Sequence, residues 1–589
     1  IRRSSHHVWS QSSIFTSFVL CSLFVLFVVA GVLAVLPERL LRQCAPWRSE
    51  ILAGVWGCLG LLALVGAVCR LEGGVSWFPV FGMDGPALPM LVLLAFTGGM
   101  MGVGLRGLAC ALTGLAFLAL SPLVFGLLAG TALVLLADRG RQGVCLPFAV
   151  IPACIPADSP LSPPSLCLMV LLLGWAVSSQ KGPEAVLPAG IGLFLLGRLL
   201  AEVGILPPVQ QGLLIVSGGA VALWGAVQAV RSPAASGILS GVASAGYGGL
   251  VVMLTLALAA PVKGGELFRT ATLLATGTPF LALLAALWLS RQDGGLFTPQ
   301  SAVAQARGNR VALGLSLLLL SAVPPLGGFS VFWCLLSAGE VAAANTHPAQ
   351  ALCLLLVLVG AACVMALGMI GLLRVGLAAF VQQSPAQQDH VQAADAPSLS
   401  SVLLLPAWLC VGCAALITMV PGGWLALVDN LFAGDTPRDF AWHTLAHVQF
   451  AGSDISLTPV FSVLALLACV AGAGALGRVF GVFPLRQAVS GAAQWREGAP
   501  IPQRDEGAEP ASPSGADASV PVVWTAFGVL LGAGGQKPSD WPVVEKTGAG
   551  ARYLQAVLFR TVACCEAQGM VLILLFLGAG LLLGLFAAK

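Results

Sequence analysis

The chain has 589 residues, of which 58% are hydrophobic and only 9% are charged, and its mean hydropathy is +0.94. A soluble domain carries about 25% charged residues, so this composition excludes a soluble enzyme or nucleic-acid-binding protein of this size. The net charge of +3 is small and indicates no acidic partner. Glycine is abundant, with 71 residues, which is typical of apolar helices that pack closely in lipid. The composition therefore predicts a polytopic membrane protein.

The N-terminal residues give an indication of targeting. The chain begins Ile1-Arg2-Arg3-Ser4-Ser5, and no acidic residue precedes Glu38. Leaders rich in arginine and serine and poor in acids are typical of mitochondrial transit peptides. We therefore interpret residues 1–12 as a stub that remains after removal of such a peptide. The alternative is that the start is missing.

Apolar stretches that could cross a bilayer, which takes about 20 residues as a helix, follow along most of the chain. They lie at 13–37, 51–69, 87–104, 107–137, 164–179, 185–203, 210–230, 236–260, 268–290, 311–337, 349–380, 400–424, 457–485, 519–534 and 562–587. The stretch 107–137 contains Ser121-Pro122, so it is either one kinked helix or two short ones. We expect about 13–16 transmembrane helices and hence an all-α polytopic membrane protein.

Polar segments divide the chain into parts. Residues 13–184 are predicted to form N-terminal helices, with a proline-rich loop over 140–164, and residues 185–425 a helical core. The later parts are an interfacial segment and helix over 426–487, a hydrophilic loop over 488–519 and C-terminal helices over 520–589. The loop is rich in proline, glycine and charge, which favours a flexible segment outside the membrane.

Ionisable residues near the apolar stretches are functional candidates, because a charge inside a bilayer is costly. Three pairs are close in sequence: Lys181 with Glu184, Arg198 with Glu202, and Lys263 with Glu266. Their spacing places the members of each pair within about one helix turn. The alternative for each is a charge that anchors a helix end at the membrane surface. No pattern for nucleotide, haem, flavin, iron–sulfur or metal binding is recognised in the sequence.

Three stretches carry a family resemblance. Residues 317–333, LLLLSAVPPLGGFSVFW, lead an apolar helix into Pro324 and Pro325 and then Gly328. Residues 188–198, PAGIGLFLLGR, place an arginine ten residues after Pro188, and residues 227–247 run from a basic loop through small residues to Gly-Tyr. In this order they resemble the antiporter-like proton-translocating subunits of respiratory complex I, NADH:ubiquinone oxidoreductase. The resemblance spans roughly residues 75–425 and is greatest to subunit 2, with subunits 5 and 4 as close alternatives.

The resemblance implies an antiporter-like fold with inverted repeats and with helices broken near Pro188 and near Pro324-Pro325, since prolines at membrane depth free backbone carbonyls. It implies a membrane-arm subunit in the mitochondrial inner membrane that contributes to, or structurally supports, proton translocation coupled to NADH:ubiquinone electron transfer. The expected partners are other membrane-arm and accessory subunits, which would hold FMN and the iron–sulfur clusters, together with bound phospholipids. No catalytic residue, cofactor site, metal site or nucleic-acid partner is expected in this chain.

The chain departs from the family at the residues that carry protons in it. A glutamate, lysines and a histidine of the family align here with uncharged residues: Gly130, Ala189, Ala234 or Ala235, Ser244 and Val331. No lysine lies between 182 and 262 or between 264 and 536. We therefore expect a degenerate proton path, or one that uses the three charged pairs above. The remaining alternatives are a component of a cation/proton antiporter and a purely structural membrane scaffold.

Overall fold

The computed structural model describes most of the chain up to residue 428 and two short strands beyond it. The described residues are 5–36, 48–68, 73–75, 78–83, 87–101, 104–137, 146–155, 159, 162–203, 206–232, 234–260, 262–292, 307–322, 326–381, 401–428, 448–449 and 456–457. The predicted loop over 488–519 and the predicted helices over 457–485, 519–534 and 562–587 lie outside the described residues, apart from the strand residue at 457.

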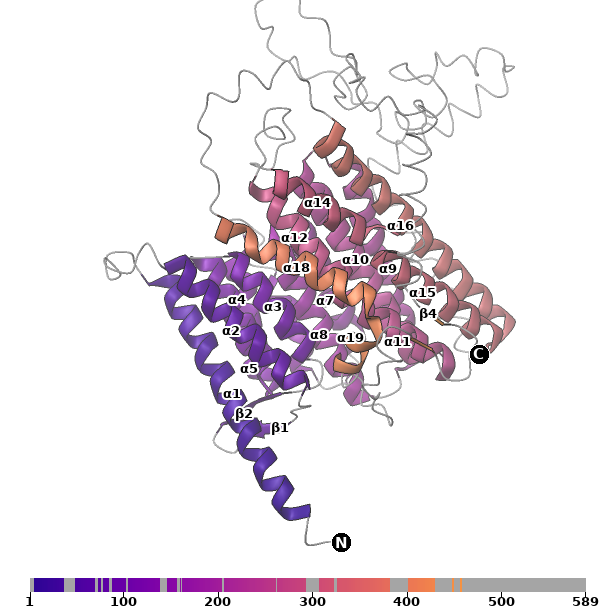
Figure 1. The fold of residues 1–589 in the computed structure, drawn as a ribbon. Coiled ribbons are helices and arrows are strands. Elements are labelled where there is room, and N and C mark those ends of the chain that lie inside the picture. The colour runs from indigo at the N-terminus through magenta and orange to yellow at the C-terminus, as the bar shows by residue number, and fades with distance from the viewer. Residues whose placement is uncertain are drawn as a thin grey trace, which may run out of the picture.

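Helices make up nearly all of the described structure (Figure 1). They are α1 (Ser5–Val35), α2 (Arg48–Val68), α3 (Ala87–Met101), α4 (Leu105–Phe117), α5 (Pro122–Leu136), α7 (Ser162–Ser179), α8 (Val186–Val203), α9 (Pro208–Arg231), α10 (Ala235–Ala259), α11 (Val262–Gly277), α12 (Pro279–Gln292), α14 (Arg307–Leu320), α15 (Gly327–Ala344), α16 (Pro348–Val381), α18 (Ser401–Met419) and α19 (Pro421–Val428). Proline opens α5, α9, α12, α16 and α19, a position where its missing N–H removes no helical hydrogen bond.

Short elements of other kinds accompany the helices. Two 3-10 helices, η2 (Leu146–Cys154) and η3 (Pro183–Ala185), precede α7 and α8. Strand β1 (Gly73–Val75) pairs antiparallel with β2 (Phe78–Met83), and β3 (Val448–Gln449) pairs antiparallel with β4 (Ser456–Leu457). These hairpins are small additions to a helical fold, so the all-α prediction is confirmed. The proline-rich segment predicted as a loop contains η2.

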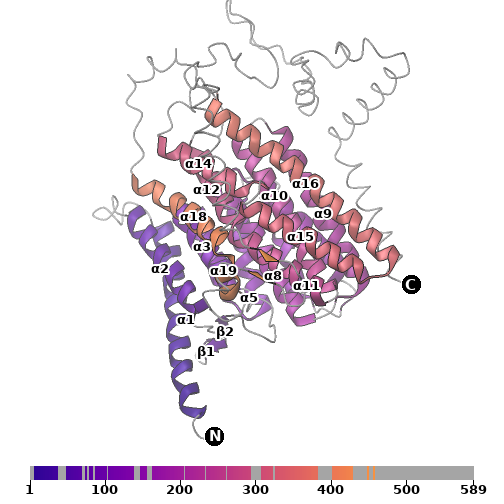
Figure 2. The ribbon, with the colours of Figure 1, turned by 45° about the vertical axis from the view of Figure 1, so that its right-hand side comes forward.

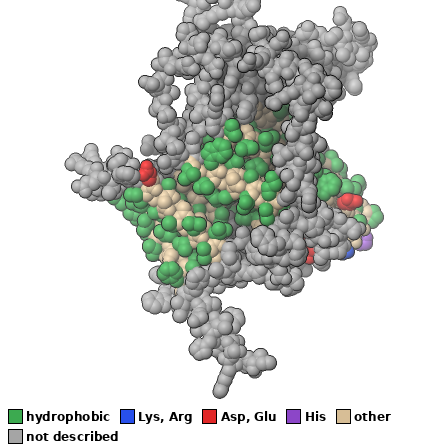
Figure 3. Space-filling model, in the orientation of Figure 1, with side chains coloured by type: hydrophobic (Ala, Val, Ile, Leu, Met, Phe, Trp, Pro, Cys, Tyr) green, Lys and Arg blue, Asp and Glu red, His purple; other side chains and the backbone are tan. Residues whose placement is uncertain are grey.

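The described helices have the length and surface of a membrane protein. The described part of the chain has seven candidate spans that are long and apolar enough to cross a bilayer, one of which runs through both α11 and α12, and six shorter apolar helices accompany them. Leu352, Leu356 and Val359 of α16 are 60%, 56% and 60% exposed. In Figure 3 the described side chains on the visible face are mostly hydrophobic, and the charged ones lie at its margins. Such a surface is stable against lipid, which confirms the multi-pass prediction.

The bundle has two sides joined by closely packed helices. Figures 1 and 2 show α1, α2 and α3 on one side, α15 and α16 on the other, and α8 between them, with α7 next to α8 in Figure 1. Helices α9 and α10 approach each other backbone to backbone, because a Cβ on Gly241 would lie 2.6 Å from the backbone nitrogen of Ala229. Glycines Gly225 and Gly248 make the same kind of approach in the other turns of this contact.

Several predicted apolar stretches are interrupted rather than continuous. Residues 107–137 form two short helices, α4 and α5, as one of the two alternatives expected. The break predicted near 324 is present, since α14 ends at Leu320 and α15 begins at Gly327; Pro324 and Pro325 themselves lie outside the described residues. Near Pro188 the chain departs from α-helical geometry in η3, which ends three residues before this proline. Pro188 itself lies in the first turn of α8, where proline is tolerated.

Candidate functional site

Helix α8 is the centre of the candidate site. Every residue from 182 to 197 is buried, so this helix has no face on the lipid over that length. Its described charged side chains lie at its two ends: Glu184 in η3, just before the helix, and Arg198 near its end. Four helices supply much of its surroundings, namely α3, α4, α7 and α10. The interior between the two charged ends is apolar.

Glu184 forms an ion pair with Arg106 from the first turn of α4. The Oε1 atom of Glu184 lies 3.1 Å from Nη1 of Arg106, and the two side chains are 3% and 39% exposed. Backbone geometry places both groups: Gly104, with a φ of 109°, starts α4, and a Cβ on Gly182 would lie 2.5 Å from Oε2 of Glu184. The position of Glu184 before α8 also favours its negative charge through the helix dipole.

Arg198 holds the opposite end of α8 against the end of α4. Its guanidinium donates one hydrogen bond to the carbonyl of Ala119, at 2.8 Å, and another to the carbonyl of Leu120. The last carbonyls of a helix have no partner within the helix, so this contact satisfies acceptors at the junction of α4 and α5. Arg198 therefore serves as a structural clamp between helices.

The other predicted site residues are placed differently. Lys181, Lys263 and Glu266 are exposed near helix starts, and the ion pair of Glu184 is formed with Arg106. This pairing has no signal in the sequence, because Arg106 is 78 residues away from Glu184 and no local spacing links the two. Glu202 belongs to α8, and its side chain lies outside the described residues.

A seam of hydroxyl and amide groups runs between α7, α9 and α10. Gln228 of α9 donates from Nε2 to the carbonyl of Ser178 at 2.9 Å, and the hydroxyl of Ser240 donates to the same carbonyl at 3.3 Å. One turn further along α10, Ser244 donates to the carbonyl of Gly174 at 3.2 Å. No local pattern in the sequence marks this seam, although Ser244 is the position that aligns with a family histidine. The seam ties helices together with neutral groups.

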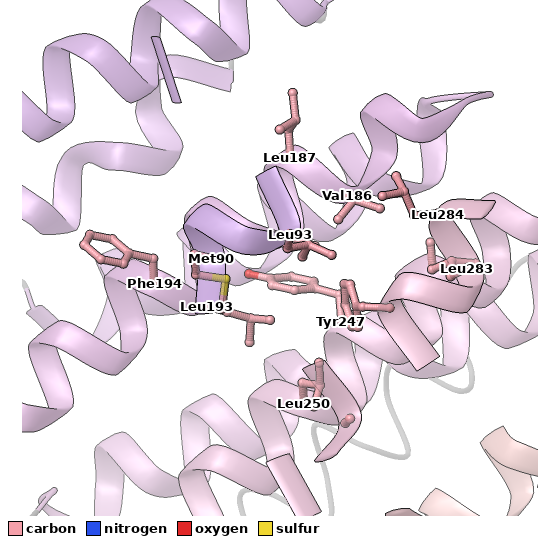
Figure 4. Packing of buried hydrophobic residues seen from close by; sticks show 14 of the residues in the cluster. Met90, Leu93, Val186, Leu187, Leu193, Phe194, Tyr247, Leu250, Leu283 and Leu284 are labelled. Carbon is pink, nitrogen blue, oxygen red and sulfur yellow. The ribbon is translucent and has the colours of Figure 1, made fainter. Parts of the chain in front are cut away.

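The next polar group along the same face of α10 is the hydroxyl of Tyr247. Tyr247 is fully buried, and its hydroxyl makes no hydrogen bond within the described part of the chain. Figure 4 shows the ring lying among apolar side chains, including Met90, Leu93 and Leu193. The seam of polar groups therefore ends at the Tyr247 ring, next to α8.

Three interrupted helices meet on the other side of the bundle. Gly327, the first residue of α15, packs against Thr278 at the junction of α11 and α12 and against Thr418 at the end of α18. The indole N–H of Trp424, in α19, donates to the carbonyl of Leu273 at 2.8 Å. All these groups are uncharged, so the helix interruptions are held by close packing around Gly327 and by the indole hydrogen bond.

The positions that align with proton-carrying residues of the family are buried. In the structure, Gly130, Ala189, Ala235, Ser244 and Val331 are all buried, and Ala234 is partly exposed. Among the described residues, the buried charged side chains are Glu184 and Arg48, and Arg48 donates to the carbonyls of Leu33 and Ala34. Over the described ranges the interior therefore offers a single buried carboxylate, Glu184, which has an arginine partner.

One pair of cysteines was not predicted as a motif from the sequence. Cys410 and Cys413 of α18 have Cys-x-x-Cys spacing, and both are free thiols. Over the described ranges, no three histidine, cysteine, aspartate or glutamate side chains gather closely enough to hold a metal ion. The pair lies in an apolar helix, as the other described cysteines of the bundle do.

These features define a class: a polytopic helical membrane protein with interrupted helices and a charge-poor interior. A chain of the membrane-bound sulfane sulfur reductase, an archaeal respiratory membrane complex, is 15% identical, with 92% of this chain and 100% of that chain covered and a TM-score of 0.56. A chain of respiratory complex I from Thermus thermophilus with bound NADH is 18% identical, with 70% and 98% covered and a TM-score of 0.51. A chain of the Mrp complex from Dietzia sp. DQ12-45-1b is 15% identical, with 72% and 96% covered and a TM-score of 0.48.

The comparisons confirm the resemblance at the level of the fold. The chain has the fold of the antiporter-like membrane subunits of complex I and related respiratory complexes. No protein-family model and no curated protein sequence matches this chain.

Proposed function

We propose that this chain is a membrane-arm subunit of respiratory complex I in the mitochondrial inner membrane, most like subunit 2. The support is the fold that this chain shares with membrane chains of two respiratory complexes. The stretches around Pro188, Tyr247 and Gly328, which follow one another in the same order as in the family, add to it. In this role its partners are other membrane-arm and accessory subunits. Those partners hold the FMN and iron–sulfur clusters of NADH:ubiquinone electron transfer, and this chain supports the coupled proton translocation.

We further propose that the chain's own proton path is degenerate. One observation carries this proposal: the interior positions where exchangeable charges are expected hold Gly130, Ala189, Ser244 and Val331, all of them buried. The buried carboxylate of Glu184 faces an arginine, which stays charged at physiological pH and cannot pass a proton on. The chain then acts as a structural member of the membrane arm, and its neighbours translocate the protons.

Co-migration tests the placement in the complex. Membranes are extracted in mild detergent and separated on a native gel, the gel is stained for NADH dehydrogenase activity, and the stained band is analysed by mass spectrometry. We expect this chain in the band with flavin and iron–sulfur proteins. Migration apart from the NADH activity would refute the placement and favour the cation/proton antiporter component or the scaffold.

Proton stoichiometry tests the degenerate path. Assembled complex carrying Glu184→Gln is reconstituted into vesicles, and protons translocated per electron are compared with the unaltered complex and with Lys181→Gln as a control. The substitution keeps the shape of the side chain and removes its charge. We expect the same ratio in all three samples. A lower ratio only in Glu184→Gln would show that this carboxylate belongs to a working path.

A further inference from the structure

An elongated cavity lies between α9, α10, α12, α15 and α16, and Figure 2 shows α9 and α10 beside α15 and α16. Its volume is about 160 Å³, and every residue that lines it is apolar or glycine. The lining runs from Val242 to Leu256 on α10 and from Val357 to Leu372 on α16. At 1.5 Å per residue, each wall is roughly 21 Å long. The cavity is therefore a long, narrow slot, which fits a linear chain better than a compact molecule.

The slot exists because glycines replace side chains along its walls. A Cβ on Gly246, Gly249 or Gly368 would meet nothing within 4 Å, and Gly246 is exposed although it lies in the middle of α10. A water molecule needs two to four polar partners, which this lining does not provide. A cavity of about 150 Å³ with apolar walls stays dry, and it is large enough to bind a small hydrocarbon. The apolar walls therefore favour a hydrocarbon over water as the occupant of the slot.

Positive charge lies beyond one end of the slot. Gly371, next to the last lining residue of α16, is in contact with Ala229 near the end of α9. Arg374 follows one turn later and donates a hydrogen bond to the carbonyl of Val230. Arg231 is exposed as the last residue of α9. None of the three helices at this end, α9, α10 and α16, contains an acidic residue.

We propose that the slot binds one acyl chain of an anionic phospholipid, with the headgroup phosphate at Arg231 and Arg374. A guanidinium matches the geometry of phosphate oxygens, and basic ends between transmembrane helices bind anionic headgroups. The acyl chain then occupies the dry slot and supports the packing of α16 on α10. This proposal does not depend on the complex in which the chain resides.

Photolabelling tests the acyl-chain site. Membranes that contain the full chain are supplied with a phosphatidylglycerol that carries a diazirine in the middle of one acyl chain, and labelled peptides are mapped after irradiation. We expect labelling of the slot-lining residues of α10 and α16. Gly246→Leu places a side chain in the slot and reduces this labelling about tenfold. Gly57→Leu on α2, where a Cβ also meets nothing within 4 Å, leaves it unchanged.

Two further variants complete the test. If Gly246→Leu does not accumulate in the membrane, Gly368→Leu fills the slot from α16 instead. Arg374→Gln lowers retention of phosphatidylglycerol in native mass spectrometry about fivefold, whereas Lys263→Gln at the start of α11 does not. Slot labelling that is equal in the unaltered and filled chains would overturn the acyl-chain site. Retention unaffected by Arg374→Gln would overturn the assignment of an anionic phospholipid.

Discussion

At α8, charged side chains hold both ends of a buried helix, whereas the described contacts at the α14–α15 interruption are neutral. Glu184 and Arg198 are tied to Arg106 and to the carbonyls at the end of α4. At the α14–α15 interruption, Gly328 packs on the carbonyl of Ser321, and the N–H of Ala322 donates to the sulfur of Met369 at 3.1 Å.

The difference follows from the cost of desolvation. A helix end needs partners for its unsatisfied N–H and C=O groups, and a charged side chain provides them well where its head can reach water. The guanidinium of Arg106 can reach water, since its side chain is 39% exposed. Deep in the bundle an unpaired charge is expensive, so hydroxyls, a thioether and close glycine contacts take its place. The chain is therefore built to pack, and most of its described charges lie near helix ends, with Arg269 in the middle of α11 as an exception.

The largest expected effect concerns the helices that join the two regions. Gly241→Leu forces a side chain into the backbone of Ala229, so α9 and α10 must separate. We expect the free energy of unfolding to fall by about 3 kcal/mol or more, because overpacking at a backbone contact cannot be relieved by a rotamer change. Unfolding of the full chain in an SDS titration measures it. Gly57→Leu is the matched control, and an equal effect of both variants would contradict the close contact.

The second prediction concerns the ion pair. Arg106→Gln leaves the buried Glu184 without its arginine, and we expect a loss of about 3 kcal/mol in the same titration. Glu184→Gln leaves a half-exposed arginine that can turn to water, so its effect is smaller. Lys181→Gln, at an exposed site, serves as the control. If Arg106→Gln and Lys181→Gln unfold alike, the pair does not hold α4 to α8.

The sequence predicts the helices well and their contacts poorly. Hydropathy finds the boundaries of α7 and α8 within two residues, because a spanning helix must be apolar along its whole length. The double proline finds the gap between α14 and α15, because proline removes a backbone donor. The partner of Glu184 and the cavity beside Gly246 have no local signal. They depend on which helices become neighbours, and spacing along the chain does not encode this.

The third prediction concerns the uncharged contact between α19 and α11, which is called the neutral joint below. Trp424→Phe keeps an aromatic ring against Gly277 but removes the N–H that donates to the carbonyl of Leu273. We expect a loss of about 1 kcal/mol, the usual net contribution of one buried hydrogen bond. Trp408→Phe on α18, where the side chain is 38% exposed, is the control. A loss of the same size in both variants would mean that the indole contact does not stabilise the joint.

The smallest expected effect tests whether the hydroxyl seam binds helices together. Ser244→Ala removes a hydrogen bond from α10 to the carbonyl of Gly174 on α7. Such bonds between membrane helices contribute about 0.6 kcal/mol on average, so the unfolding midpoint should shift slightly. Ser316→Ala is the matched control, since Ser316 is equally buried but donates within its own helix, to Ala312. Because the hydroxyl of Ser316 joins no second helix, only Ser244→Ala should loosen α7 from α10. Increased hydrogen exchange in α7 of the Ser244 variant alone would show that the seam joins the helices. Equal exchange in both variants would reduce it to a set of local hydrogen bonds.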